Sequence, residues 1–360
     1  MENPSQAIKV MIVDDSAVMR GVVRRLLDAD PQLEMTAAAS NGELALKALG
    51  QHAVDVVLLD IEMPVMDGLD ALRRIVVEHP AVKVIMVSTL TRRNAEISLE
   101  ALKIGAADYV AKPEAGIATA TEFGRDLIAK VKALAASRGS RLVVPPSSPV
   151  QAASANAELR YSRARRPVAR ALGIGASTGG PPALLKLFRD LQGAATRQPI
   201  LLTQHMPATF TALLAEQIER AAGRPCAEGR DGEPVLPGRI YVAPGGWHMT
   251  IENGPTSPVI RLDQGAPQHF CRPAVDPMLR SLAAVYGDGA LAAILTGMGA
   301  DGALGCEAVA RAGGRFIAQD QATSAVWGMP AAAAATGLAE AVLPLDEIGP
   351  WLRRATESAA

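Results

Sequence analysis

Short apolar runs alternate with helical patterns along the first third of the chain. Runs with the length and composition of buried strands lie at residues 8–13, 35–39, 54–59, 82–87 and 107–110. Apolar residues with the spacing of an amphipathic helix lie at residues 17–27, from 43, from 69, from 95 and at 122–135. Five strand-and-helix repeats in succession predict an α/β domain with a doubly wound parallel sheet, a (βα)5 unit. In such a sheet the functional groups gather at the carboxyl ends of the strands.

Polar side chains stand at these strand ends. Asp14 and Asp15 follow the first strand, Asp60 the third, Ser88 the fourth and Lys112 the fifth. Three carboxylates at one sheet edge repel one another unless a cation lies among them, and their hard oxygen atoms suit Mg²⁺. One carboxylate could then accept a phosphoryl group while the metal and Lys112 balance its charge. Alternatively, the aspartates cap helices and turns and the lysine is solvated.

The character of the chain changes between residues 137 and 167. This stretch lacks periodicity and is rich in Pro, Ser and Ala, as expected for an interdomain linker. It separates a domain at residues 1–136 from a second one at residues 168–360. Its basic second half is either solvated or meets an acidic partner or the other domain; the arginines concerned are Arg160, Arg163, Arg165 and Arg166.

A glycine-rich turn opens the second domain. An apolar run at residues 168–174 predicts a strand, and residues 183–191 predict a helix. Residues 175–179 between them fit the pattern G-x-S-x-G, in which a sharp turn exposes the serine hydroxyl and brings backbone N–H groups close to a developing oxyanion. Ser177 is then a candidate nucleophile. The alternative is a phosphate-binding turn in which Ser177 only caps the helix.

Two further predicted strands of this domain end in groups that suit a serine nucleophile. Residues 199–203 lead to His205, and residues 290–295 lead to Asp301. In an acyl-transfer site the imidazole accepts the serine proton and the carboxylate orients the imidazole. A purely structural role for His205 remains the alternative.

The stretch between the second and third of these strands has a different pattern. Residues 224–262 are rich in Pro and Gly and contain short β-favouring runs at 239–242 and 259–262. They predict an antiparallel insertion in a parallel α/β domain. Residues 276–286 return to a helical pattern.

Charge and composition argue against several classes of protein. The 36 Lys and Arg residues against 37 Asp and Glu give a net charge of −1, which argues against nucleic acid as a partner, as does the lack of a C-terminal helix-turn-helix pattern. Nothing in the chain reads as a signal peptide or as a run of 18 apolar residues, so we expect a cytoplasmic protein without membrane insertion. An odd number of cysteines without C-x-x-C spacing predicts buried thiols; they are Cys226, Cys271 and Cys306.

The first domain resembles the receiver domains of two-component response regulators over roughly residues 7–130. The motifs are Val13-Asp14-Asp15-Ser16, Leu58-Leu59-Asp60-Ile61-Glu62-Met63-Pro64, Met66-Asp67-Gly68, Ser88 and Lys112-Pro113. The resemblance implies that Asp60 is the phosphoacceptor and that Mg²⁺ is held by Asp14, Asp15, Asp60 and the Glu62 carbonyl. It also implies that Ser88 responds to phosphorylation, that Tyr109 follows it as the aromatic switch residue, and that Lys112 contacts the phosphoryl group.

The second domain is similar to the catalytic domain of the chemotaxis protein-glutamate methylesterase/glutaminase (CheB) family. The motifs are Gly175-Ala176-Ser177-Thr178-Gly179-Gly180, Gln204-His205-Met206-Pro207, Tyr241-Val242-Ala243-Pro244-Gly245-Gly246-Trp247-His248, Cys271-Arg272-Pro273, Val275-Asp276 and Leu295-Thr296-Gly297-Met298-Gly299-Ala300-Asp301-Gly302. The resemblance implies that Ser177 is the nucleophile, His205 the general base and Asp301 the orienting acid. It further implies that the backbone N–H of Met298 belongs to the oxyanion hole and that the hydrolase needs no cofactor.

Together the two resemblances imply a hydrolase controlled by phosphorylation. Its substrates would be glutamate γ-methyl esters, and certain glutamines, on methyl-accepting chemotaxis receptors, and its phosphodonor would be the histidine kinase of the pathway. Two alternatives remain: a receiver-containing phosphate sink or adaptor that binds receptors without turnover, and a hydrolase of a non-chemotaxis chemosensory pathway.

Overall fold

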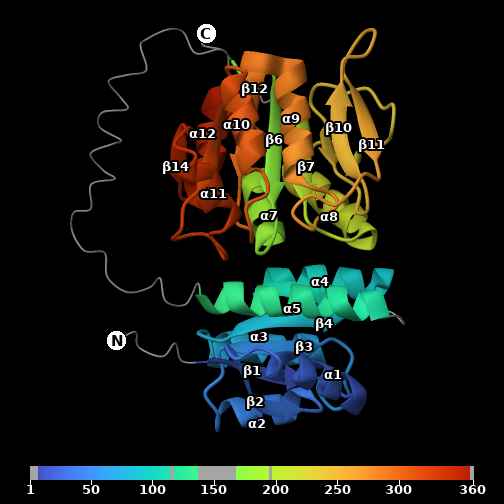
Figure 1. Ribbon diagram of the computed structural model, residues 1–360, viewed down its shortest axis with the longest axis vertical. Helices are drawn as coiled ribbons and strands as arrows, with labels where there is room; N and C mark the ends of the chain where they lie inside the picture. The colour runs from blue at the N-terminus through green and yellow to red at the C-terminus, as the bar shows by residue number, and fades with distance from the viewer. Residues whose placement is uncertain (1–6, 114–116, 137–167, 194–196, 357–360) are drawn as a thin grey trace, which may run out of the picture.

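The computed structural model describes residues 7–113, 117–136, 168–193 and 197–356 (Figure 1). The predicted linker at residues 137–167, with the arginine cluster of its second half, lies outside the described residues. Two α/β units follow one another along the chain, each built on a sheet of its own.

The first unit is the predicted (βα)5 domain. Its five strands pair in parallel in the order β2-β1-β3-β4-β5, and four helices begin at side-chain caps, at Ser16, Asn41, Asp67 and Thr91. The elements are β1 (Ile8–Val13), α1 (Ala17–Asp28), β2 (Leu33–Ala39), α2 (Gly42–Leu49), β3 (Val56–Asp60), α3 (Gly68–Glu78), β4 (Lys83–Ser88), α4 (Arg92–Ile104), β5 (Asp108–Ala111) and α5 (Ile117–Ala136).

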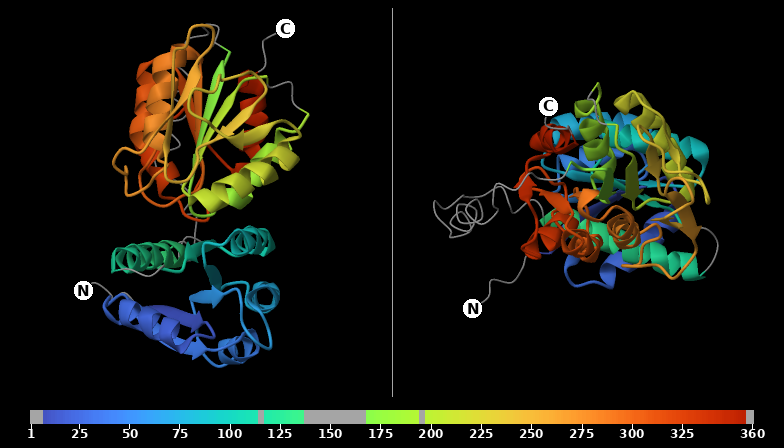
Figure 2. Two further views of the ribbon diagram at one scale, coloured as in Figure 1. Left: turned by 90° about the vertical axis from the view of Figure 1, so that its right-hand side faces the viewer. Right: turned by 90° about the horizontal axis from the view of Figure 1, so that it is seen from above.

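The second unit is built on a seven-stranded sheet in the order β14-β13-β12-β6-β7-β9-β8, with every pair parallel. Helices cover both faces of this sheet (Figures 1 and 2). Its strands are β6 (Ala171–Ala176), β7 (Ile200–Gln204), β8 (Cys226–Glu228), β9 (Ile240–Val242), β12 (Ala290–Ile294), β13 (Arg315–Gln319) and β14 (Ala341–Leu343), and its helices are α7 (Gly180–Asp190), α8 (Ala208–Ala222), α9 (Val275–Tyr286), η2 (Gly287–Gly289), α10 (Ala303–Arg311), α11 (Met329–Ala335) and α12 (Leu345–Thr356).

The prediction for residues 224–262 is partly wrong. Strands β10 (His248–Glu252) and β11 (Val259–Asp263) form the expected antiparallel hairpin. Residues 239–242, however, belong to the main sheet, where β9 pairs in parallel with β7 and β8 pairs in parallel with β9. A short apolar run between turns does not reveal its pairing partner, because the partner lies far away in the chain. Ile240, Tyr241 and Val242 are fully buried, as expected for a strand inside a parallel sheet.

Helices α4 and α5 of the first unit face the second unit (Figures 1 and 2). At their interface the ring of Tyr109 stacks on that of Phe210 in α8, with centroids 4.2 Å apart and planes 8° from parallel. Val326, from the second unit, belongs to the buried cluster that includes Phe123 and Leu127 of α5. The two units are therefore joined by a packed apolar interface.

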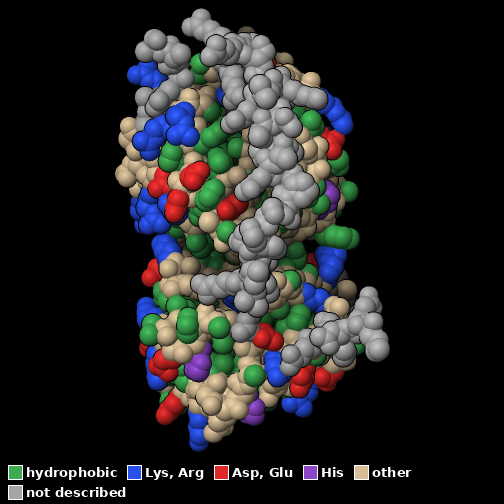
Figure 3. All heavy atoms as spheres, turned by 90° about the vertical axis from the view of Figure 1, so that its left-hand side faces the viewer, with side chains coloured by type: hydrophobic (Ala, Val, Ile, Leu, Met, Phe, Trp, Pro, Cys, Tyr) green, Lys and Arg blue, Asp and Glu red, His purple; other side chains and the backbone are tan. Residues whose placement is uncertain are grey.

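The surface carries both signs of charge. On the face shown in Figure 3, lysine and arginine side chains alternate with acidic ones over both units. Among the described residues, no helix is both long enough and apolar enough to cross a membrane. Cys226 and Cys306 are buried free thiols as predicted, whereas Cys271 is partly exposed, contrary to the prediction.

Candidate active site and candidate phosphorylation site

The carboxyl edge of the first sheet brings Asp14, Asp60 and Lys112 together. The Lys112 Nζ atom lies 2.8 Å from Asp60 Oδ1 and 3.0 Å from Asp14 Oδ2. Asp14 and Asp60 are buried. Burial raises the pKa of Asp60, an effect to which Asp14 adds and which Lys112 opposes. Although burial alone would lower the pKa of Lys112, the two carboxylates raise it, so the lysine stays charged.

The same edge has a donor set that suits a hard cation. Asp14, Asp15 and Asp60 each offer a carboxylate oxygen, and these atoms lie within 4.8 Å of one another. Asp15 is exposed at the mouth of this group, and Glu62 is exposed in the loop after β3. Oxygen ligands of this kind fit Mg²⁺.

Within the described part of the chain, no hydrogen bond joins Ser88 to Tyr109, the two predicted switch residues. The Ser88 hydroxyl lies 3.1 Å from the hydroxyl of Ser98 in α4. Tyr109 packs outward against Phe210, and Lys130 Nζ donates to its backbone oxygen at 2.7 Å. Tyr109 is therefore part of the interface between the two units.

The turn after β6 exposes Ser177 and requires glycine. Gly179 has φ +74°, and a Cβ atom there would lie 2.4 Å from the Cβ of Ala325. The turn is closed by a hydrogen bond from Gly180 N to Ser177 O at 2.7 Å, and Ser177 N donates to Thr296 O at 3.0 Å. Ser177 thus stands between the end of β6 and the loop that follows β12, partly exposed.

His205 follows β7, the other neighbour of β6. Its backbone N donates to Ala176 O at 3.1 Å, and the side chain of Gln204 donates to the carbonyl of Ser177 at 2.9 Å. These bonds hold the strand ends that carry Ser177 and His205 against each other. The chain runs from β6 outward to β7 on one side and later to β12 on the other, so this edge is a topological switch point, where α/β proteins place their sites.

The imidazole of His205 is paired with Asp301. His205 Nε2 lies 2.7 Å from Asp301 Oδ2, and Asp301 is 1% exposed. Burial would raise the pKa of Asp301, but His205 and the N–H groups of Val275 and Asp276 lower it below its ordinary value. Burial would likewise lower the pKa of His205, but Asp301 and Cys271 outweigh it and raise that pKa. The Asp301 carboxylate therefore stabilises the imidazolium that forms once His205 has accepted a proton.

The loop after β12 passes directly beside the serine. A Cβ atom at Gly297 would lie 2.9 Å from the Cβ of Ser177, so only glycine allows this approach. Met298 follows it, partly buried, and packs against the same apolar cluster as Val326. The residue that lies against the predicted nucleophile is therefore Gly297, which directly precedes Met298, the predicted oxyanion residue.

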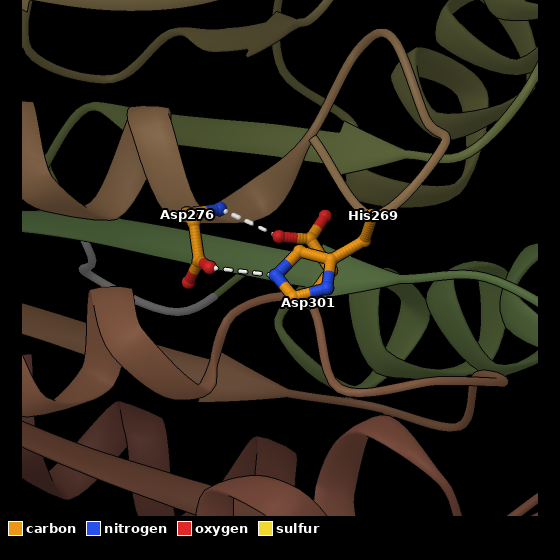
Figure 4. A group of neighbouring side chains, drawn as sticks. All are labelled: His269, Asp276 and Asp301. Carbon is orange, nitrogen blue, oxygen red and sulfur yellow. Dashed lines mark hydrogen bonds and ion pairs between the residues drawn. The ribbon is translucent and has the colours of Figure 1, made fainter. Parts of the chain in front are cut away.

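Three residues surround the pair that the sequence analysis named only within motifs or among the cysteines, without assigning them a role in the site. Gln204 joins the two strand ends, and Cys271 lies beside the His205 ring. Asp276 contacts the Asp301 segment and pairs with His269, as Figure 4 shows. Only Gln204 could have been assigned to the site from its position relative to a strand, because it directly precedes His205 at the end of β7. Cys271 and Asp276 come from elsewhere in the chain and reach the site through tertiary contacts.

His269, Asp276 and Asp301 also lie close enough to be considered as a metal site. Their acceptor atoms are already used: both oxygens of Asp301 accept backbone N–H groups, and Asp276 accepts two more and pairs with His269. The group is therefore a complete hydrogen-bonded network without an ion.

Each of the two units matches a known protein family. The family described as CheB methylesterase matches residues 172–352, and the response regulator receiver domain matches residues 10–120. The chain is 49% identical over 370 residues to the protein-glutamate methylesterase/protein-glutamine glutaminase of Azospirillum brasilense, with 98% of this chain and 94% of that protein covered. It is 47% identical over 376 residues to protein-glutamate methylesterase/protein-glutamine glutaminase 1 of Paramagnetospirillum magneticum, with 98% of both chains covered.

A solved structure supports the same assignment for the second unit. The crystal structure of the Thermotoga maritima CheB methylesterase catalytic domain is 37% identical, covers 52% of this chain and 98% of its own, and superposes with a TM-score of 0.50. The chain therefore belongs to the CheB methylesterase family, in the form that carries a response regulator receiver domain ahead of the catalytic domain.

Proposed function

We propose that this protein is a serine hydrolase that removes methyl groups from glutamate γ-methyl esters of methyl-accepting chemotaxis receptors, deamidates certain of their glutamines, and is activated by phosphorylation of Asp60. The observation that carries the proposal is the His205–Asp301 pair, 2.7 Å apart, at the sheet edge where the β6 turn presents Ser177. The names of its close relatives support the substrate class.

The first half-reaction forms an acyl-enzyme. Because Nε2 of His205 faces Asp301, its Nδ1 atom is the one available to Ser177. As the Ser177 oxygen attacks the γ-carbonyl carbon, Nδ1 accepts the serine proton, and Asp301 stabilises the resulting imidazolium. The tetrahedral oxyanion accepts a hydrogen bond from the backbone N–H of Met298. When the C–O bond to the methoxy group breaks, the leaving oxygen takes the proton from Nδ1 and departs as methanol.

The second half-reaction restores the serine. A water molecule attacks the acyl carbon, gives one proton to Nδ1, and the proton passes to the Ser177 oxygen as that bond breaks. The product is glutamate. With a glutamine substrate the same sequence releases ammonia instead of methanol.

The receiver edge supplies the switch. An Asp60 oxygen attacks the phosphorus atom of a phosphohistidine on the kinase, and the P–N bond breaks. Asp14, Asp15, Asp60 and the Glu62 carbonyl would hold Mg²⁺, which would supply positive charge to neutralise the phosphoryl oxygens. Lys112, already 2.8 Å from Asp60, remains as the protein's own counter-charge, and the Ser88 hydroxyl would turn toward the phosphoryl group.

The interface accounts for gating. Burial raises the pKa of Asp108, and Lys130 and the hydroxyl of Thr178, which follows Ser177, offset part of that rise. The receiver thus lies beside the nucleophile turn, and in this arrangement it would hinder the approach of a bulky receptor to Ser177. Phosphorylation would draw Tyr109 inward, break its stack on Phe210 and loosen this contact, which shifts the population toward an open state.

The test is methanol release. Receptor membranes with labelled methyl esters are incubated with the protein, with and without a small-molecule phosphodonor and Mg²⁺, beside Ser177→Ala and Asp60→Asn. We expect release that needs Ser177 and that rises with phosphodonor only when Asp60 is present. No release from any receptor preparation, with phosphorylation of Asp60 still detectable, would refute the proposal for these substrates.

We propose that the reaction takes place in the cytoplasm, where the histidine kinase would act; the three free cysteines of the described residues support this proposal.

A further inference from the structure

The start of α9 binds the carboxylate of Asp301. Val275 N donates to Asp301 Oδ2 at 2.6 Å, and Asp276 N donates to Oδ1 at 2.9 Å. These are the first N–H groups of a twelve-residue helix and have no partner within it. The orientation of the carboxylate toward His205 therefore depends on where the chain that carries Asp301 lies relative to this helix end.

The side chain of Asp276 fixes that position. Its Oδ1 atom accepts from Gly302 N at 3.0 Å and from Gly305 N at 2.7 Å, in the first turn of α10. Helix α10 has no side-chain cap of its own, because its N-cap residue is Gly302. A Cβ atom at Gly302 would lie 2.9 Å from Ile294 and 3.0 Å from Val275, so a capping side chain cannot be placed there.

The two aspartates thus make a reciprocal pair. Asp301, just ahead of α10, binds the N–H groups of α9, and Asp276, in α9, binds those of α10. The second oxygen of Asp276 lies 3.1 Å from His269 Nε2, the contact drawn in Figure 4. Asp276 is fully buried, so its carboxylate has no surface open to a substrate.

We propose that Asp276 is a positioning residue of the hydrolase: by capping α10 from α9 it holds the Asp301 carboxylate in line with His205 Nε2. The effect of Asp276 on catalysis rests on the proposed function, whereas its effect on the position of the Asp301 carboxylate does not. Loss of the Asp276 carboxylate leaves two buried N–H groups without an acceptor and lets the Asp301 segment move. A displacement of the order of 1 Å at such a site lowers the rate by about 100-fold.

The experiment compares three variants of the full chain. We expect Asp276→Ala to lower kcat for methanol release by about 10- to 100-fold with little change in KM, because Asp276 does not touch substrate. Asp276→Asn keeps an oxygen acceptor for both N–H groups, so its kcat should lie clearly above that of Asp276→Ala. Val309→Ala removes core packing from the same helix α10, away from its first turn, and should lose stability without the loss of kcat per folded molecule.

A second readout separates positioning from a merely structural role. The imidazole of His205 is titrated by NMR, with its signals assigned by their loss in His205→Gln. The titratable groups that face it are Asp301 and Cys271. In Asp276→Ala the midpoint should fall toward the ordinary histidine value, because Asp301 no longer holds the imidazolium; in Val309→Ala it should not move.

Three results would overturn the inference: an unchanged His205 midpoint in Asp276→Ala, equal kcat in the Asn and Ala variants, or the same loss of kcat in Val309→Ala. If the unmodified protein releases no methanol from any receptor, the proposed function fails, and the titration still decides whether Asp276 positions Asp301.

Discussion

The stack of Tyr109 on Phe210 offers a direct way to loosen the interface from the hydrolase side. The rings lie 4.2 Å apart and nearly parallel, and both side chains are buried. Phe210→Leu keeps an apolar side chain at this position in α8 and removes the ring contact. It leaves the receiver residues untouched, so phosphorylation of Asp60 should proceed as before.

The size of the effect follows from the geometry. An aromatic pair of this kind contributes about 0.5–1.5 kcal/mol beyond its buried area. If the closed arrangement dominates without phosphate, removing that amount raises the open fraction, and hence the basal rate, by about 2- to 12-fold. Once phosphorylation has opened the protein, the stack is already broken. The fully phosphorylated rate should therefore not change, and the activation ratio should shrink by the same factor.

The assay is methanol release at saturating receptor, with and without phosphodonor. Phe316→Leu, a buried phenylalanine in β13, is the control for general loss of packing and should change neither rate per folded molecule. A basal rate of Phe210→Leu equal to that of the unmodified protein, with activation still intact, would refute the idea that this stack holds the closed state.

Three further predictions concern single residues. Asp301→Asn should lower kcat by roughly 10³- to 10⁴-fold in methanol release and move the acid limb of the pH–rate profile to lower pH, because the raised pKa of His205 depends on that carboxylate; unchanged kinetics would contradict the assigned role. Lys112→Met should lower the melting temperature more in EDTA than in Mg²⁺, since it leaves buried carboxylates unpaired, and equal losses would argue against a cation at that edge. Gly179→Ala should cost about 1–3 kcal/mol in denaturant unfolding, because its φ of +74° and the Cβ of Ala325 both oppose a side chain; a neutral result would contradict the turn geometry.

The elements that the sequence predicted well are those with a local signature. Apolar runs of strand length identified the five strands of the first unit, and the residues at their carboxyl ends, such as Asp14 and Asp60, meet at one edge because parallel strands all end there. The same rule brought Ser177 and His205 to neighbouring strand ends. In each case a residue's position relative to its own strand was sufficient.

What the sequence could not supply depends on pairing between distant segments. The run at residues 239–242 looks the same whether it joins a hairpin or the main sheet, and only its neighbour β7 decides. Asp276 acts on α10 across 26 residues of chain. Phe210 meets Tyr109 from another unit. None of these contacts can be predicted from the local spacing of apolar and polar residues.

Strand β5 connects the proposed phosphorylation edge with the elements that carry the proposed catalytic residues. Asp108 and Tyr109 are successive residues of β5. The hydroxyl of Thr178 lies close enough to Asp108 to lower the pKa of that carboxyl, and the ring of Phe210 stacks on that of Tyr109. Thr178 directly follows Ser177, and Phe210 lies in the helix that begins just after His205. The strand that ends at the phosphorylation edge therefore touches the elements that hold both the nucleophile and the base. Coupling then needs no relay through the interior of the hydrolase, and variants in β14 or α12, on the far side of the sheet, should leave the activation ratio unchanged.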